Sequence, residues 1–136
     1  MTFEARFTSL ATPKPRQQAR HLTLLEPKPK LELFVERETG LELPEGFLVF
    51  DLRSRTVGKN NLPALELRAS NGISVVVLVF APIGTSNTPR IVSRNIGGSF
   101  VWAIGNLARA ELEKTAASVK APLDLNLLLS SYQNLR

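Results

Sequence analysis

Side chains that could transfer protons or bind a metal are few in this chain. It has no cysteine and one histidine, His21, which excludes thiolate nucleophiles, thiolate zinc sites and disulfides. The acidic residues are scattered, without the dense spacing of a calcium loop. Glu111 and Glu113 lie two positions apart in a predicted helix, so they point in different directions. These observations disfavour an enzyme, and no cofactor or metal is expected.

A glycine-rich stretch, IGGSF at residues 96–100, is the remaining candidate for such a site. Backbone N–H groups of this kind of turn can bind phosphate at the start of a helix. The stretch lacks both a Lys-Ser/Thr pair and a G-x-G-x-x-G pattern, and the chain has no G-x-S-x-G elbow. A tight strand-to-helix turn is therefore the favoured interpretation.

Basic residues offer a more informative chemistry. Residues 47–70, FLVFDLRSRTVGKNNLPALELRAS, alternate apolar and polar positions on either side of a basic turn. This pattern predicts two strands whose outward face carries Arg53 and Arg68. The net charge of +5 and the pI near 10.1 favour a polyanionic partner such as nucleic acid, although mixed charge that keeps an exposed sheet soluble is the alternative. The predicted RNA-binding residues are Arg53, Arg55, Lys59, Arg68, Arg90 and Arg94.

The elements that must position these arginines follow from periodicity. Alternation predicts seven short strands: two in an N-terminal hairpin at 1–26, then five in an antiparallel sheet within 30–95, at 30–38, 47–53, 64–70, 73–81 and 90–95. In the strand 47–53, Leu48, Phe50 and Leu52 should face inward, and Val49, Asp51 and Arg53 outward.

From Ser99 the apolar spacing becomes three or four, which predicts a helix to about Lys120 and, after Pro122, a shorter helix in the helical region 99–136. The expected fold is α+β in one domain, residues 1–136, with helices on one face of the sheet and the other face open. No apolar run reaches the roughly 18 residues of a membrane span. A soluble intracellular protein is therefore expected.

Three residues suggest self-association. Gly105 would lie within the first predicted helix, where a glycine permits close approach of another backbone. Trp102 would lie beside the apolar stripe of that helix, and Val77 lies in a strand that is apolar on both faces. They predict a homodimer interface. An incidental glycine and an extra core tryptophan are the alternatives.

The strand count and order resemble the coat proteins of single-stranded RNA bacteriophages. The local likeness lies in VFDLRSRTVGKNNLPALELR, similar to that family's paired central strands, and in the tail KAPLDLNLLLSSYQNLR, similar to its second helix. The resemblance implies a dimer whose sheets join edge to edge, whose helices pack over the partner, and which assembles into an icosahedral virion shell around single-stranded RNA. It also implies an RNA hairpin on the open face as a translational-repression signal; Asp51 and Glu66 would repel its phosphates.

Two other functions fit the same pattern. One is a small dimeric module that binds single-stranded nucleic acid, which requires aromatic residues on the open face for base stacking. Phe34 is the only aromatic residue that the predicted strands place clearly on a polar side. The other is a phage tail or head-completion protein.

Overall fold

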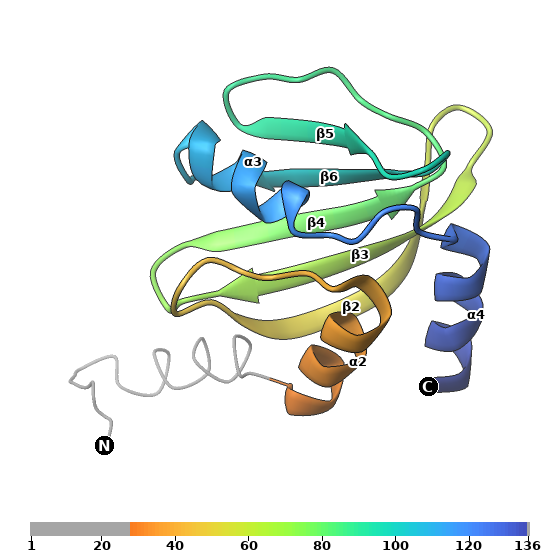
Figure 1. The fold of residues 1–136 in the computed structure, drawn as a ribbon, viewed down its shortest axis with the longest axis horizontal. Coiled ribbons are helices and arrows are strands. Elements are labelled where there is room, and N and C mark those ends of the chain that lie inside the picture. The colour runs from red at the N-terminus through yellow and green to blue at the C-terminus, as the bar shows by residue number, and fades with distance from the viewer. Residues whose placement is uncertain (1–27, 136) are drawn as a thin grey trace, which may run out of the picture.

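The computed structural model describes residues 28–135, and the predicted hairpin at 1–26 lies outside them. The centre of the fold is an antiparallel sheet whose strand order is β2-β3-β4-β6-β5 (Figure 1). After β4 the chain crosses over through residues 82–90 to the edge strand β5 and then returns as β6 between β4 and β5. The strands are β2 (Leu48–Val57), β3 (Leu62–Ser70), β4 (Val75–Ala81), β5 (Ile91–Asn95) and β6 (Phe100–Gly105).

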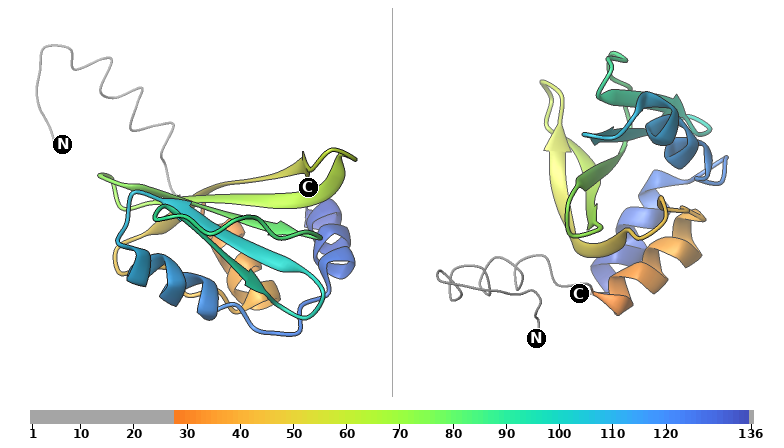
Figure 2. Two further views of the ribbon diagram at one scale, coloured as in Figure 1. Left: turned by 90° about the horizontal axis from the view of Figure 1, so that it is seen from above. Right: turned by 90° about the vertical axis from the view of Figure 1, so that its left-hand side faces the viewer.

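Three helices cover one face of this sheet. They are α2 (Pro29–Thr39), α3 (Arg109–Ala117) and α4 (Leu125–Leu135), and Figure 2 shows all of them on the same side. The main core lies between these layers, and the Tyr132 hydroxyl ties α4 to β2 by donating to the Leu52 carbonyl oxygen at 2.8 Å. The α+β class, the five-stranded antiparallel sheet and the helices that follow it are as predicted. Within residues 28–135, no helix combines the length and apolar character needed to cross a membrane.

The strand predicted at 30–38 is wrong, because this segment forms α2. Pro29 stands at the start of the helix, where its missing N–H costs nothing, and Gly40 ends it in a left-handed conformation with φ of 72°. Phe34 and Val35 are buried in the core, whereas Leu33 is exposed. The apolar positions therefore follow a helical spacing, which the alternation of three residues in this short segment imitated.

The helix predicted to begin at Ser99 is also wrong over its first part. Residues 100–105 form β6, which pairs with β4 on one side and β5 on the other. Val101 and Ala103 point into the main core, and Trp102 and Ile104 point to the opposite face. Valine, isoleucine and aromatic residues favour strands, and pairing on both edges completes that preference. The helical part begins only at α3.

A bulge in β2 and one turn also differ from expectation. A bulge between Val49 and Asp51 shifts the register of β2, so Val49 points into the core and not outward as predicted. The turn in IGGSF joins two strands, since the Ile96 N–H donates to the Ser99 carbonyl oxygen at 2.7 Å. Both of its glycines have positive φ, as a tight hairpin turn requires. The sequence therefore needs no phosphate to explain this stretch.

Candidate nucleic-acid interface

The face of the sheet that the helices leave uncovered is called here the open face. Strand registers place its side chains in rows that cross the sheet. One row contains Arg53, Glu66, Val79, Trp102 and Ser93, and the next contains Asp51, Arg68, Val77, Ile104 and Ile91. The open face is thus divided into a charged half on β2 and β3 and an apolar half on β4, β6 and β5.

The charged half is organised by ion pairs. Arg55 Nη1 donates to Glu66 Oε1 at 2.8 Å, and Arg68 Nε donates to Glu66 Oε2 at 2.8 Å. Arg53 Nε donates to Asp51 Oδ2 at 3.0 Å. Three of the predicted RNA-binding residues are therefore neighbours on one half of one face. Both acids that were expected to repel phosphate are held by arginine.

Glu66 is the buried member of this group. The whole Glu66 residue is only 5% exposed, whereas the side chains of Arg55 and Arg68 are 39% and 42% exposed. Burial alone would raise the pKa of the Glu66 carboxyl, but hydrogen bonds and charges from Arg68 and then Arg55 outweigh it and lower that pKa. The hydrogen bond and charge of Asp51 raise the pKa of Arg53. The carboxylate thus lies ionised beneath two partly exposed guanidinium groups.

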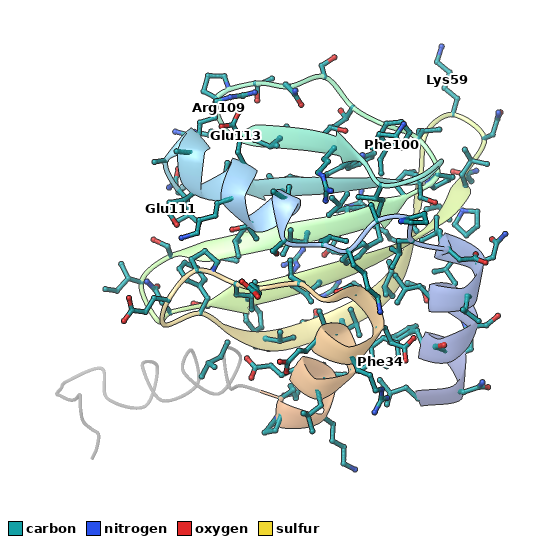
Figure 3. All side chains as sticks on the ribbon, in the orientation of Figure 1. Phe34, Lys59, Phe100, Arg109, Glu111 and Glu113 are labelled. Atoms are coloured by element: carbon teal, nitrogen blue, oxygen red, sulfur yellow. The ribbon has the colours of Figure 1, made fainter. Side chains whose placement is uncertain are left out.

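The acids of the described residues are distributed unevenly between the two faces. Within the five strands, Asp51 and Glu66 are the only acidic residues. The others lie in the helices and the loops that flank them, as with Glu111 and Glu113 on α3 (Figure 3). Sequence reasoning weighed Glu66 only as a source of repulsion. Glu66 lies opposite Arg53, diagonal to Arg55 on β2, and two residues before Arg68 on the same face of β3. These positions were the available signal for pairing.

The remaining predicted RNA-binding residues are dispersed. Lys59 projects from the tip of the β2–β3 hairpin (Figure 3), and its side chain is exposed. Arg90 is exposed just before β5, at the far corner of the sheet. Arg94 points to the helix side, where its guanidinium donates to the carbonyl oxygens of Ala116 and Val119. The structure therefore places Arg94 in the scaffold and away from the open face.

Aromatic residues that sequence reasoning missed lie on the apolar half. Because 100–105 is a strand, Phe100 and Trp102 both point to the open face, and both are partly exposed. The Trp102 Nε1–H donates to the Ile83 carbonyl oxygen at 3.0 Å, which fixes the indole. Phe34, the one stacking candidate that the alternating pattern offered for the binding-module alternative, is instead buried and packs edge-on against Tyr132. The strand-forming sequence FVWAI was the signal for this placement.

The predicted interface residues also lie together on this half, in strands and not in a helix. Val77 is paired with Ile104, and Trp102 with Val79. Gly105 is explained within the chain, because a Cβ atom there would lie 3.0 Å from the Val75 carbonyl oxygen. Beside it lies a shallow concavity of about 440 Å³. Its lining, named here the apolar corner, includes Ile73, Val75, Ile104, Gly105 and Arg90, and Ile73 is 92% exposed.

Groups suited to catalysis are sparse in residues 28–135. No cluster of three or more histidine, cysteine or acidic side chains is placed there to bind a metal ion. Glu113 pairs with Arg109 on α3 at 3.2 Å, and the two acids of that helix do not form a pair. His21 lies outside the described residues. The open face is the candidate site that these residues support best.

Comparisons with models of protein families, with curated proteins and with solved structures gave no match to this chain.

Proposed function

We propose that this protein binds single-stranded nucleic acid, RNA being the expected partner, through the open face of its sheet. The observation that carries the proposal is the cluster of Arg53, Arg55 and Arg68 on the charged half, where both acids are already paired. Guanidinium groups suit phosphate because they present several donors in one plane. Lys59 at the hairpin tip extends the same half.

The apolar half favours single strands over duplexes. Neighbouring strands are about 4.8 Å apart, so Arg68 on β3 and Ile104 on β6 are separated by about 10 Å at the backbone. This spacing lets the phosphate of one nucleotide meet the charged half while its base lies on the apolar half. Unpaired bases can stack on aromatic residues such as Phe100 and Trp102, whereas a duplex keeps its bases inside.

Trp102 provides a direct test, because it is the only tryptophan of the chain and lies on the proposed face. We expect its fluorescence to change on titration with an oligouridine of about 15 nucleotides, and less on titration with duplex RNA of the same length. Arg55→Gln and Arg68→Gln should each weaken binding about five- to tenfold.

The matched control is Arg109→Gln. Arg109 lies on α3, its side chain is 41% exposed, and it forms an ion pair just as Arg55 and Arg68 do. The substitution removes the same charge from the helix side of the sheet, so binding should stay within about twofold of the wild type. Equal losses in all three variants would mean that net charge, and not the open face, attracts the nucleic acid. Absence of any binding by the wild type would refute the proposal.

Self-association and packaging of RNA in a shell remain predictions from the sequence. The apolar corner supports self-association, because Ile73 and Val75 expose apolar surface beside a concavity. Electron microscopy of the purified protein tests the shell. Uniform particles that contain nuclease-protected RNA would support a coat protein, whereas a soluble dimer with bound RNA would support a binding module.

A further inference from the structure

We infer that Glu66 is a positioning residue, a buried carboxylate that holds Arg55 and Arg68 as a two-armed receptor for one backbone phosphate. This inference rests on the proposed function and deepens it, since it assigns a phosphodiester oxygen as the ligand of a defined pair of side chains. It also reverses the expectation that Glu66 repels phosphate.

Glu66 uses only some of the hydrogen-bond donors of Arg55 and Arg68. A guanidinium group has five N–H donors. Arg55 commits Nη1 to Glu66, and Arg68 commits Nε to the other carboxylate oxygen. Within residues 28–135 neither guanidinium has another hydrogen-bond partner among the interactions of the structure. Both Nη groups of Arg68 therefore remain able to donate to an anion.

Glu66 also keeps two like charges, the guanidinium groups of Arg55 and Arg68, close together. Arg55 and Arg68 lie on neighbouring strands, and without an intervening anion their positive charges would separate the flexible side chains. Glu66 contacts both, one oxygen to each, so it holds the two guanidinium groups close together. A phosphate that meets them need not order either side chain, which reduces the entropic cost of binding.

The carboxylate of Glu66 lies deeper in the open face than the two guanidinium groups that it holds. Glu66 is 5% exposed and lies beneath arginine side chains that are about two-fifths exposed. A ligand that approaches the open face therefore meets the guanidinium groups before the carboxylate. Because attraction and repulsion both fall with distance, the exposed positive charges determine the sign of the interaction at the surface.

The experiment compares variants that separate charge from position. Glu66→Gln removes one negative charge from the face, so a purely electrostatic surface would bind the oligouridine more tightly. Positioning predicts the opposite, a loss of about tenfold in affinity measured by Trp102 fluorescence. Glu66→Asp keeps the charge but is too short to reach both arginines, and it should weaken binding by about fivefold. Glu113→Gln on α3 is the matched control and should change affinity by less than about twofold.

A substitution at a partly exposed arginine tests the inference with less risk of unfolding the protein than a substitution of the buried Glu66. Arg68→Lys retains the charge of a side chain that is 42% exposed, but it loses the donor fork, so it should weaken binding by about fivefold. Circular dichroism and thermal unfolding establish that each variant is folded. Tighter binding by Glu66→Gln, or unchanged binding by both Glu66→Asp and Arg68→Lys, would overturn the inference while leaving the proposed function intact. A wild-type protein that binds no oligonucleotide would overturn both.

Discussion

The guanidinium group of Arg94 reaches from β5 to the end of α3, where its Nη1 donates to the carbonyl oxygen of Val119 at 2.8 Å. The same nitrogen donates to the Ala116 carbonyl oxygen at 2.9 Å. Carbonyl groups at the end of a helix lack partners within the helix and carry partial negative charge. Arg94 therefore fastens α3 to the edge of the sheet.

Replacement of this arginine should lower stability without affecting RNA binding. We expect Arg94→Met to reduce the free energy of unfolding by about 1.5–3 kcal/mol, the usual contribution of hydrogen bonds to a charged group. Urea denaturation measures the loss, and Arg90→Met, at an exposed position, serves as the control. Equal stability of the two variants, or a loss of RNA affinity by folded Arg94→Met, would contradict this assignment.

Salt should weaken the proposed RNA binding in a defined way. For single strands, the logarithm of the binding constant falls by about 0.7 for each phosphate contact per unit of log salt concentration. One phosphate shared by Arg55 and Arg68, with one each for Arg53 and Lys59, thus predicts a slope of about –2 between about 50 and 200 mM salt. Fluorescence titrations at several salt concentrations give the slope. A salt-independent affinity would show that phosphate contacts do not drive binding.

The ionisation of Glu66 should make stability depend on pH. Because its pKa is lowered in the folded protein, its contribution is fully present above the pKa of the unfolded chain, about 4.3 for glutamate. That contribution is lost as the pH falls through the lower folded value. The free energy of unfolding of the wild type should therefore fall more steeply below about pH 4.3 than that of Glu66→Gln. Parallel pH profiles from urea denaturation would contradict this expectation.

Two adjacent glycines allow conformational strain and steric contact to be measured separately. Gly97 and Gly98 have φ of 92° and 96°, so alanine is strained at both positions. A Cβ atom on Gly97 would lie 2.5 Å from the Pro122 Cβ atom, whereas one on Gly98 would meet nothing within 4 Å. We expect Gly98→Ala to lower the free energy of unfolding by about 1–2 kcal/mol and Gly97→Ala by about 1–3 kcal/mol more. Equal losses in thermal or urea unfolding would show that Pro122 moves aside freely.

The apolar corner should mediate self-association. Ile73 is the most exposed of its apolar residues, so Ile73→Asp should raise the dimer dissociation constant by about tenfold or more without unfolding the chain. Sedimentation velocity over a range of concentrations measures the effect. Leu33→Asp, on the exposed side of α2, is the control for an added charge at an exposed apolar position. If both variants sediment like the wild type, the dimer forms elsewhere or not at all.

Much of the sheet could be predicted from the sequence because its pattern depends on local alternation. The strands β3 and β4 and the helix α4 lie close to the predicted ranges. The segment that became α2 is short, and three alternating apolar residues fit a strand as well as a helix. Its proline start and glycine end were the deciding signals.

The candidate site was predictable only in part, because pairing between strands lies beyond local patterns. The sequence placed Arg53 and Arg68 on the open face, where the structure has them. It could not show that Arg94 points to the helix side, because β5 has an apolar residue on each face, Ile91 and Val92, so alternation alone does not select the side. Nor could it place Trp102 on the open face, because the identity of β6 depends on its pairing with β4 and β5.

The position of β6 between β4 and β5 has a consequence for the protein while it is being synthesised. The edge of β4 that β6 later occupies has no partner until residues 82–105 have left the ribosome. At about 5–20 residues per second this takes about one to five seconds. Throughout that interval a hydrophobic strand edge is open to other nascent chains, which is the usual starting point for aggregation. Slow translation through residues 82–105 would prolong the exposure, and rapid translation or a chaperone bound at this stage would favour the native sheet.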